Sequence, residues 1–245
     1  GLAAKWDDGW VGRYYAQKSA ILGLTITPSV AFKATDKLSL SAGVNAMYGY
    51  VSVTTRINNV FPPGIGDGQM QYKDEDWGFG GTLGLAYEPS PQTRFGATYT
   101  SQIKLNFAAQ TRFANLGTIG TALQTAGLLS PQLQIGMTVP QSVMTSMYHE
   151  LDSRWAILGN LGWAQWSKFG DVEIGVTTNP PTALNTQSKF KDTWHVALGA
   201  QYKYSDPWLL SGGIAYDSSM VDDVNRSIVL PLGSTVALGF GARYK

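Results

Sequence analysis

Apolar and small polar residues alternate in one segment after another, and this pattern restricts the fold of the chain more than any other feature. In residues 22–33, for example, Leu22 and Leu24 alternate with Gly23 and Thr25. A period of two places the two sets on opposite faces of a β-strand. The pattern recurs at residues 38–50, 77–88, 94–106, 143–151, 155–163, 194–203, 208–216 and 236–244. We therefore predict about nine antiparallel strands.

The polar face of these segments consists of Gly, Ser, Thr, Asn and Gln with few charges. Only 14% of the 245 residues are charged, whereas a soluble domain averages about 25% and places Lys, Glu and Asp on the wet face of a sheet. Aromatic residues lie near segment ends on the apolar face, where membrane interfaces place them: Tyr87, Trp155, Tyr202, Trp208 and Tyr244. The mean hydropathy of −0.09 is too polar for membrane-spanning helices. We expect an all-β, transmembrane, up-and-down antiparallel β-barrel rather than a soluble sandwich.

The connections between the segments also favour a barrel. Short turns at residues 34–37, 89–93, 152–154 and 205–207 alternate with long connections at 57–76, 108–141, 178–192 and 217–234. Outer-membrane barrels have short periplasmic turns and longer extracellular loops. No repeat or linker divides the chain, so we expect a single transmembrane β-barrel domain over residues 1–245. It should lie in a bacterial outer membrane as a monomer, in contact with lipid or detergent.

Composition argues against several partners and chemistries. A net charge of +1 with scattered basic residues offers no footprint for nucleic acid. Two histidines and no cysteine cannot build a Cys/His zinc site, and we expect the acidic groups at 74–76 and 222–223 to be solvated rather than to bind calcium. Neither His149 nor His195 has a Ser or Asp at convincing strand spacing. We expect no enzyme, no catalytic residue, no metal and no cofactor.

Short strings spread along the chain add a family resemblance. They include Trp10-Val11-Gly12-Arg13-Tyr14, Asp76-Trp77-Gly78-Phe79, Val139-Pro140-Gln141, Trp166-Ser167-Lys168-Phe169, Lys191-Asp192-Thr193-Trp194 and Gly213-Ile214-Ala215-Tyr216-Asp217. In this order, at matching strand ends, they resemble the FadL/TodX family of outer-membrane transporters for long-chain fatty acids and other hydrophobic compounds. The resemblance implies a 14-stranded barrel with an N-terminal plug. This chain looks like an internal fragment of such a barrel, without the plug and the terminal strands.

The resemblance implies passive diffusion of hydrophobic compounds, such as long-chain fatty acids or monoaromatic hydrocarbons, through the outer membrane. Such transport needs an apolar capture surface and a few orienting polar groups. We expect residues 114–129 to be partly helical and to turn Leu116, Ile119 and Leu123 toward the barrel mouth. Trp10 and Tyr14 belong either to an interfacial girdle or to a substrate groove.

Polar residues on the expected lumen face are candidates for orienting a carboxylate. They are Gln102, Lys104 and His195, with Arg56, Lys203 and Asn45 beside them, and Glu88 or Asp217 is an expected salt-bridge partner. A general polar-solute porin remains an alternative, although the sequence lacks its facing rows of acidic and basic residues. An outer-membrane lipolytic enzyme or an adhesin is a further alternative. The sequence leaves open fatty acid or aromatic hydrocarbon as the substrate, and the lumen or a lateral opening as the route.

The alternation also predicts which side chains face lipid. We expect the following to point outward: Leu24, Leu40, Leu83, Tyr99, Leu198 and Phe240. We expect the following to point inward: Thr25, Ser41, Thr82, Lys104, Gly199 and Gly241. A shift of one residue in register would invert every assignment on its strand.

Overall fold

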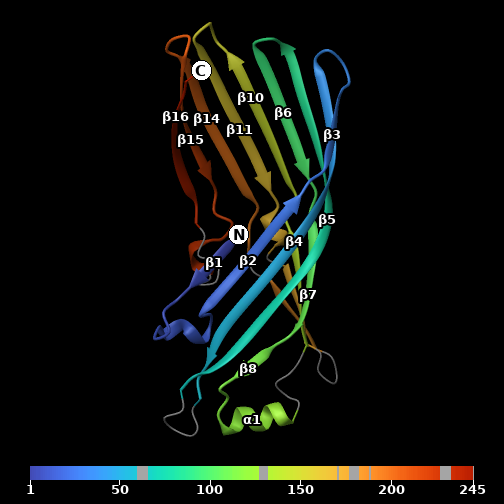
Figure 1. Cartoon of the computed structure of the whole chain (residues 1–245), viewed down its shortest axis with the longest axis vertical. Coiled ribbons are helices and arrows are strands. Elements are labelled where there is room, and N and C mark those ends of the chain that lie inside the picture. The colour runs from blue at the N-terminus through green and yellow to red at the C-terminus, as the bar shows by residue number, and fades with distance from the viewer. Residues whose placement is uncertain are drawn as a thin grey trace.

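The computed structural model describes residues 1–59, 66–126, 132–169, 171–176, 182–187, 189–226 and 233–244. These residues form almost entirely antiparallel β-structure that curves into a half-barrel (Figure 1). None of the helices within them is long and apolar enough to cross a membrane. The main sheet has the order β1 (Leu2–Lys5), β2 (Lys18–Ile26), β4 (Leu38–Ile57), β5 (Gly68–Ser90), β6 (Thr93–Thr100), β10 (Ser142–Glu150), β11 (Trp155–Ala164), β14 (Thr193–Lys203), β15 (Trp208–Asp217) and β16 (Thr235–Tyr244).

Further elements branch from this wall. In the main sheet β3 (Ser29–Lys33) also pairs with β4, and β8 (Arg112–Ala114) pairs with β5. A second sheet has the order β13 (Thr182–Gln187), β12 (Asp171–Val176), β9 (Gln132–Val139) and β7 (Ile103–Gln110). The helix α1 spans Thr118–Thr125, and short 3-10 helices span Val11–Tyr14, Trp166–Lys168 and Asp223–Asn225.

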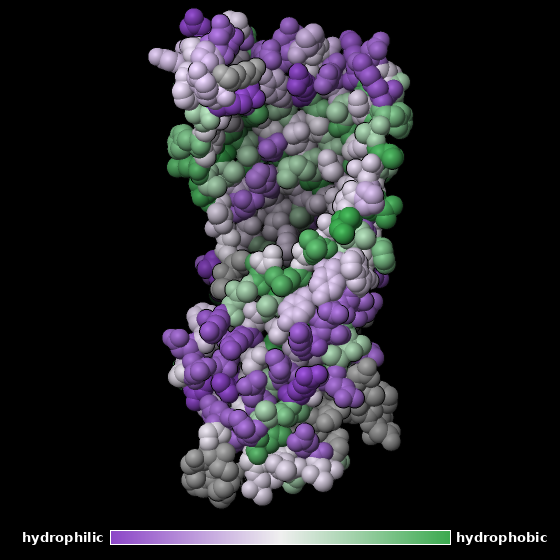
Figure 2. Space-filling model, in the orientation of Figure 1, coloured by the Kyte–Doolittle hydropathy of each residue, from purple (hydrophilic) through white to green (hydrophobic). Residues whose placement is uncertain are grey.

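The wall is the meander that the alternation predicts. Its strands pair with their chain neighbours once the hairpins of the second sheet are set aside. One face carries exposed apolar side chains, among them Leu24, Leu83, Tyr99, Leu198 and Phe240, while Leu40 on this face is partly buried. In a membrane-spanning wall such a face meets lipid, so the face with Thr25, Ser41, Thr82, Gly199 and Gly241 is the inner one. Figure 2 shows the upper half hollowed, with hydrophilic residues gathered at both ends.

The predicted segment 22–33 is divided into β2 and β3 because Pro28 interrupts the ladder. Proline has no N–H to donate to a neighbouring strand. Its carbonyl oxygen still accepts a hydrogen bond from the Val44 N–H at 3.1 Å. Both halves therefore remain paired with β4.

The buried core lies beyond the membrane-spanning part of the wall, at the end with the long hairpins in the lower part of Figure 1. By its long connections this end is extracellular. There the hairpin β7–β9 packs on the inner side of β4 and β5. Its buried cluster consists of Val51, Tyr72, Leu105, Phe107, Met137 and Phe169. We call this region, with β8, α1, β12 and β13, the extracellular cap.

Glycines allow β7 to approach the wall this closely. A methyl group on Gly78 would lie 2.6 Å from the Lys104 carbonyl oxygen, and one on Gly49 would lie 2.6 Å from Leu105 Cδ1. Real Cβ atoms do not tolerate such distances from backbone, so the absence of a side chain at position 78 fixes the place of β7.

Two predictions about connections and one about a strand are wrong in and near the cap. Residues 57–76 were expected to form a connection, but β4 continues to Ile57 and β5 begins at Gly68. Residues 108–141 contain the end of β7 together with β8, α1 and β9. The segment 94–106 is not one wall strand, because β6 ends at Thr100 and β7 turns inward. Ile103 and Leu105 are consequently buried in protein rather than exposed to lipid.

Candidate functional site

The inner wall carries one polar pair near the extracellular ends of β14 and β15. The register places His195 of β14 opposite Asp217 of β15. His195 Nδ1 lies 2.7 Å from Asp217 Oδ1, and the two side chains are 28% and 54% exposed. The expectation that His195 has no Asp at convincing strand spacing is wrong, because the register of β14 and β15 places Asp217 opposite it. We also expect His195 to orient a solute carboxylate, but the neighbouring Asp217 carboxylate disfavours a second anion at this position.

Two residues on the neighbouring strands complete a row across the inner wall. His195 is opposite Gly162 of β11, which is opposite Met144 of β10. A methyl group on Gly162 would lie 2.9 Å from Met144 Cε and 3.2 Å from His195 Cβ. The Met144 thioether and the imidazole therefore flank the same glycine. We call Met144, Gly162, His195 and Asp217 the lumen row.

The wall beside the lumen row carries small, mostly uncharged side chains. The next inward positions toward the periplasm are Asn160, Ala197 and Ala215, which are aligned by the same registers. Beyond them Gly199 is opposite Gly213. Small side chains therefore line the inner wall at this level.

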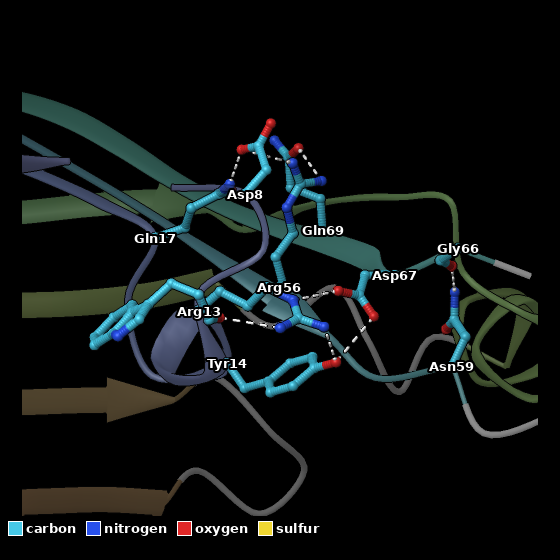
Figure 3. Close-up of polar contacts among 10 residues, drawn as sticks. Asp8, Arg13, Tyr14, Gln17, Arg56, Asn59, Gly66, Asp67 and Gln69 are labelled. Carbon is cyan, nitrogen blue, oxygen red and sulfur yellow. Dashed lines mark hydrogen bonds and ion pairs between the residues drawn. The ribbon is translucent and has the colours of Figure 1, made fainter. Parts of the chain in front are cut away.

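Tyr14 belongs to an extracellular clamp (Figure 3). Trp10 belongs to it too, because its carbonyl oxygen accepts a hydrogen bond from Arg13 Nη1 at 3.0 Å. Arg13 Nε donates to Asp67 Oδ2 at 2.6 Å, and the Tyr14 hydroxyl donates to Asp67 Oδ1 at 3.1 Å. The Arg13 guanidinium holds the pKa of the Asp67 carboxyl below its usual range, and burial raises the pKa of Tyr14. Trp10 stacks on Trp6 with ring centroids 4.6 Å apart. These residues fasten the loop 6–17 to the start of β5.

A second ion pair strengthens the clamp. Arg56 Nη2 lies 3.7 Å from Asp8 Oδ1, and Arg56 Nη1 donates to Gln69 Oε1 at 3.4 Å. The prediction that Arg56 lies on the lumen face is wrong, because β4 carries it beyond the membrane into this clamp (Figure 3).

Gln102 and Lys104 lie where the chain leaves the wall and turns inward. Both are exposed, and Lys104 is on the face of β7 opposite to the buried Ile103 and Leu105. The lumen row and Lys104 are therefore on different sheets. The structure does not gather Gln102, Lys104 and His195 into one site.

The acidic residues near Trp77 hold β7 in place. Asp76 Oδ2 accepts a hydrogen bond from the Asn106 N–H at 2.6 Å, and Asp74 Oδ2 accepts one from the Ala108 N–H. The expectation that these carboxylates are merely solvated is wrong, because the free edge of β7 supplies them with donors. Asp222 pairs with Lys191, and Asp223 pairs with Arg226 at 2.8 Å.

The predicted mouth helix is present as α1 (Thr118–Thr125), which lies near the outer end of the cap in Figure 1. Leu116 precedes it and is partly buried. The side chains of Ile119 and Leu123 lie outside the residues that the structure describes, so their contact with the mouth stays a prediction.

The remaining candidates have partners of their own. Lys203 Nζ lies 2.8 Å from Asp206, and Arg94 Nε lies 3.7 Å from Glu88. Asn45 is buried and accepts a hydrogen bond from the Thr27 hydroxyl at 2.9 Å. Lys203 is thus salt-bridged as expected, but its partner is a turn residue three positions away, while Glu88 pairs with Arg94 and Asp217 with His195.

Two residues of interest are not apparent from the sequence. Met144 lies on a weakly patterned strand, and only the register of β10 with β11 brings it beside His195. Tyr72 is 2% exposed, and burial in the cap raises its pKa to about 12. The sequence signal for Tyr72 is its spacing of two from Met70, in a segment whose sequence otherwise resembles a loop.

Comparison with known proteins agrees with this architecture. The Escherichia coli O6:H1 (strain CFT073) protein named "Long-chain fatty acid transport protein" is 26% identical over 270 residues, covering 100% of this chain and 60% of the relative. The "47 kDa outer membrane protein" of Pasteurella multocida (strain Pm70) is 29% identical with the same coverage. The chain thus spans about 60% of the length of these curated relatives.

Solved structures show the same fold. The structure described as a Pseudomonas aeruginosa FadL homologue superposes with a TM-score of 0.85 at 22% identity, over 100% of this chain and 60% of that one. The Ralstonia pickettii toluene transporter TbuX gives a TM-score of 0.71 at 20% identity, over 100% and 66%. All 245 residues also match one protein family. The chain belongs to the family described as "Outer membrane protein transport protein (OMPP1/FadL/TodX)".

Proposed function

We propose that the protein carries hydrophobic compounds, such as long-chain fatty acids or monoaromatic hydrocarbons, passively through the outer membrane. The observation that carries this proposal is the apolar cluster of the cap, which lies on the inner side of the wall at the extracellular mouth. A water-filled pore would expose charged side chains at its mouth. Here Leu105, Phe107 and Met137 pack together instead.

The names of relatives point to the same class of solute. One relative is named for long-chain fatty acids and one solved structure for toluene. The smooth inner wall at Ala197, Ala215 and Gly199 supports this proposal, because it offers little charge that would hold a polar solute.

The lipolytic alternative has less support. His195 with Asp217 supplies two members of a hydrolytic triad. Within the described part of the chain, however, no hydroxyl group is hydrogen-bonded to His195. His149 Nδ1 lies 2.9 Å from the Thr93 hydroxyl oxygen, but no described carboxylate is paired with that imidazole.

Proteoliposomes separate the proposal from the polar porin. The intact protein is reconstituted, and entry of radiolabelled toluene and oleate is compared with osmotic swelling in glucose. We expect faster entry of at least one hydrophobic solute than in protein-free vesicles, with little swelling in glucose. Swelling in glucose at the rate of a general porin, without faster toluene or oleate entry, would overturn the proposal.

A further inference from the structure

We propose that the lumen row is a binding station for apolar solutes that carry a hydroxyl group, with phenols as the simplest class. The inference rests on the proposed function, since it names a solute class for the same lumen. It is carried by the pairing of His195 with Asp217 and by the position of Met144 beside them.

The carboxylate of Asp217 determines what the imidazole can offer. An ionised carboxylate only accepts hydrogen bonds, so the proton between the two groups, whose heavy atoms are 2.7 Å apart, belongs to His195 Nδ1. In the neutral ring Nε2 then carries a lone pair. Among the described residues Nε2 has no hydrogen-bond partner. With the ring neutral, as in a test at alkaline pH, the station therefore presents an acceptor toward the lumen.

An acceptor beside a carboxylate selects among the hydrophobic solutes. A solute carboxylate would face both the lone pair of His195 Nε2 and the negative charge of Asp217, and both interactions are repulsive. A hydrocarbon such as toluene has no hydrogen to donate and would leave the acceptor unsatisfied. A phenol or an alcohol donates its O–H to Nε2 and keeps an apolar body.

The apolar body meets the other half of the row. Met144 lies next to His195 over Gly162, where a methyl group would be 3.2 Å from Met144 Sδ. A thioether makes favourable contacts with an aromatic ring and adapts to its shape. Ala197 and Ala215 add a small apolar surface one row away. The row thus pairs one hydrogen-bond acceptor with an adaptable apolar wall.

The direct test uses the histidine signals. In intact ¹⁵N-histidine-labelled protein, the ring signals that disappear in His195→Phe are assigned to the His195 imidazole. Phenol and toluene are matched probes because each has seven heavy atoms in a monosubstituted ring. We expect phenol to shift the Nε2 resonance in a saturable manner, and toluene to cause a much smaller shift. An Nε2 resonance that does not respond to saturating phenol would overturn the station.

Uptake provides the second readout. Since a neutral hydrogen bond contributes about 0.5–1.5 kcal/mol, phenol should compete for the lumen roughly threefold to tenfold better than toluene. His195→Phe should abolish that preference while toluene entry continues, and Gln201→Met, a polar-to-apolar change on the same face of β14, should preserve it. A preference that survives His195→Phe would refute the station.

The two proposals fail in different ways. If neither toluene nor oleate enters faster than in empty vesicles, transport of hydrophobic compounds is wrong, whereas the Nε2 shift still decides whether phenol binds. If hydrophobic solutes enter and Nε2 does not respond to phenol, only the station is wrong.

Discussion

Replacing Gly78 by alanine should loosen the extracellular cap and leave the wall intact. The added methyl group would lie 2.6 Å from the Lys104 carbonyl oxygen and 3.0 Å from Leu105 Cδ2. Carbon contacts are comfortable at about 3.5–4.0 Å, so β7 must retreat by about 1 Å. A gap of that size forfeits about a quarter to a half of the local dispersion energy.

The retreat affects three buried side chains of β7, namely Ile103, Leu105 and Phe107. Each contributes roughly 1.5–3 kcal/mol through burial. We expect the loss to total about 2 kcal/mol, within the range of about 1–3 kcal/mol that overpacking costs. At about 1.4 kcal/mol per factor of ten, the open population of the β7–β9 hairpin should rise roughly thirtyfold.

Hydrogen–deuterium exchange of the intact protein measures this population. Peptides from β7 and β9 should exchange roughly thirtyfold faster in Gly78→Ala, and peptides from β14 should be unchanged. The matched control is Gly159→Ala in the wall strand β11, where the added methyl would meet Leu198 Cδ2 at an ordinary 3.6 Å. Unchanged protection of β7 in a folded Gly78→Ala protein would refute the argument that this glycine positions the hairpin.

Three further predictions concern the clamp, the lipid-facing wall and the edge of β7. Arg13 lowers the pKa of Asp67, so the ion pair stabilises the clamp at pH values above the unfolded carboxyl pKa of about 3.9. This stabilisation is lost as the pH falls through the lowered pKa of the folded state. Protease cleavage in loop 6–17 should therefore increase at acidic pH, and Asp67→Asn should be cleaved readily already at pH 7. Leu198→Lys places a charge on the lipid face and should lower the stability of the inserted barrel by about 2–4 kcal/mol, which reduces the inserted fraction in a gel-shift assay. Ala197→Lys, on the inner face, should insert normally in that assay. Asp76→Ala should speed amide exchange at Asn106, since it removes a charge-assisted hydrogen bond worth roughly 1.5–3 kcal/mol, while Asp76→Asn should preserve much of the protection; equal exchange in both variants would contradict this role.

The wall was predictable because its two faces meet different surroundings. Segment 155–163 became β11 (Trp155–Ala164), since lipid demands an apolar side chain at every second position. The inward turn of β7 was not predictable by the same reasoning. Ile103 and Leu105 continue the alternation of β6, and apolar residues suit a protein core as well as lipid. The pattern therefore contains no sign that the neighbour changes from lipid to protein after Thr100.

The candidate site was predictable only in part. The alternation assigns His195 to the inner face, but its distance of 22 residues from Asp217 becomes a contact only through the register of β14 and β15. The positions of charged residues were harder to predict. Arg56 looked like a lumen residue because β4 was expected to end near the membrane, whereas it extends to Ile57. Beyond the bilayer, the two faces of a long hairpin do not differ in hydrophobicity as the lipid and lumen faces do. Its strands are therefore harder to predict from the alternation.

The two carboxylates that hold β7 also protect the protein against aggregation with its neighbours on the cell surface. The outer edge of a sheet is a template on which strands of other molecules add and aggregate. The edge of β7 that faces away from β9 is such a template, and Asp74 and Asp76 occupy its Ala108 and Asn106 N–H groups. A pair of negative charges at this edge also repels an approaching backbone carbonyl. The second sheet can thus protrude from the cell without recruiting strands from its neighbours.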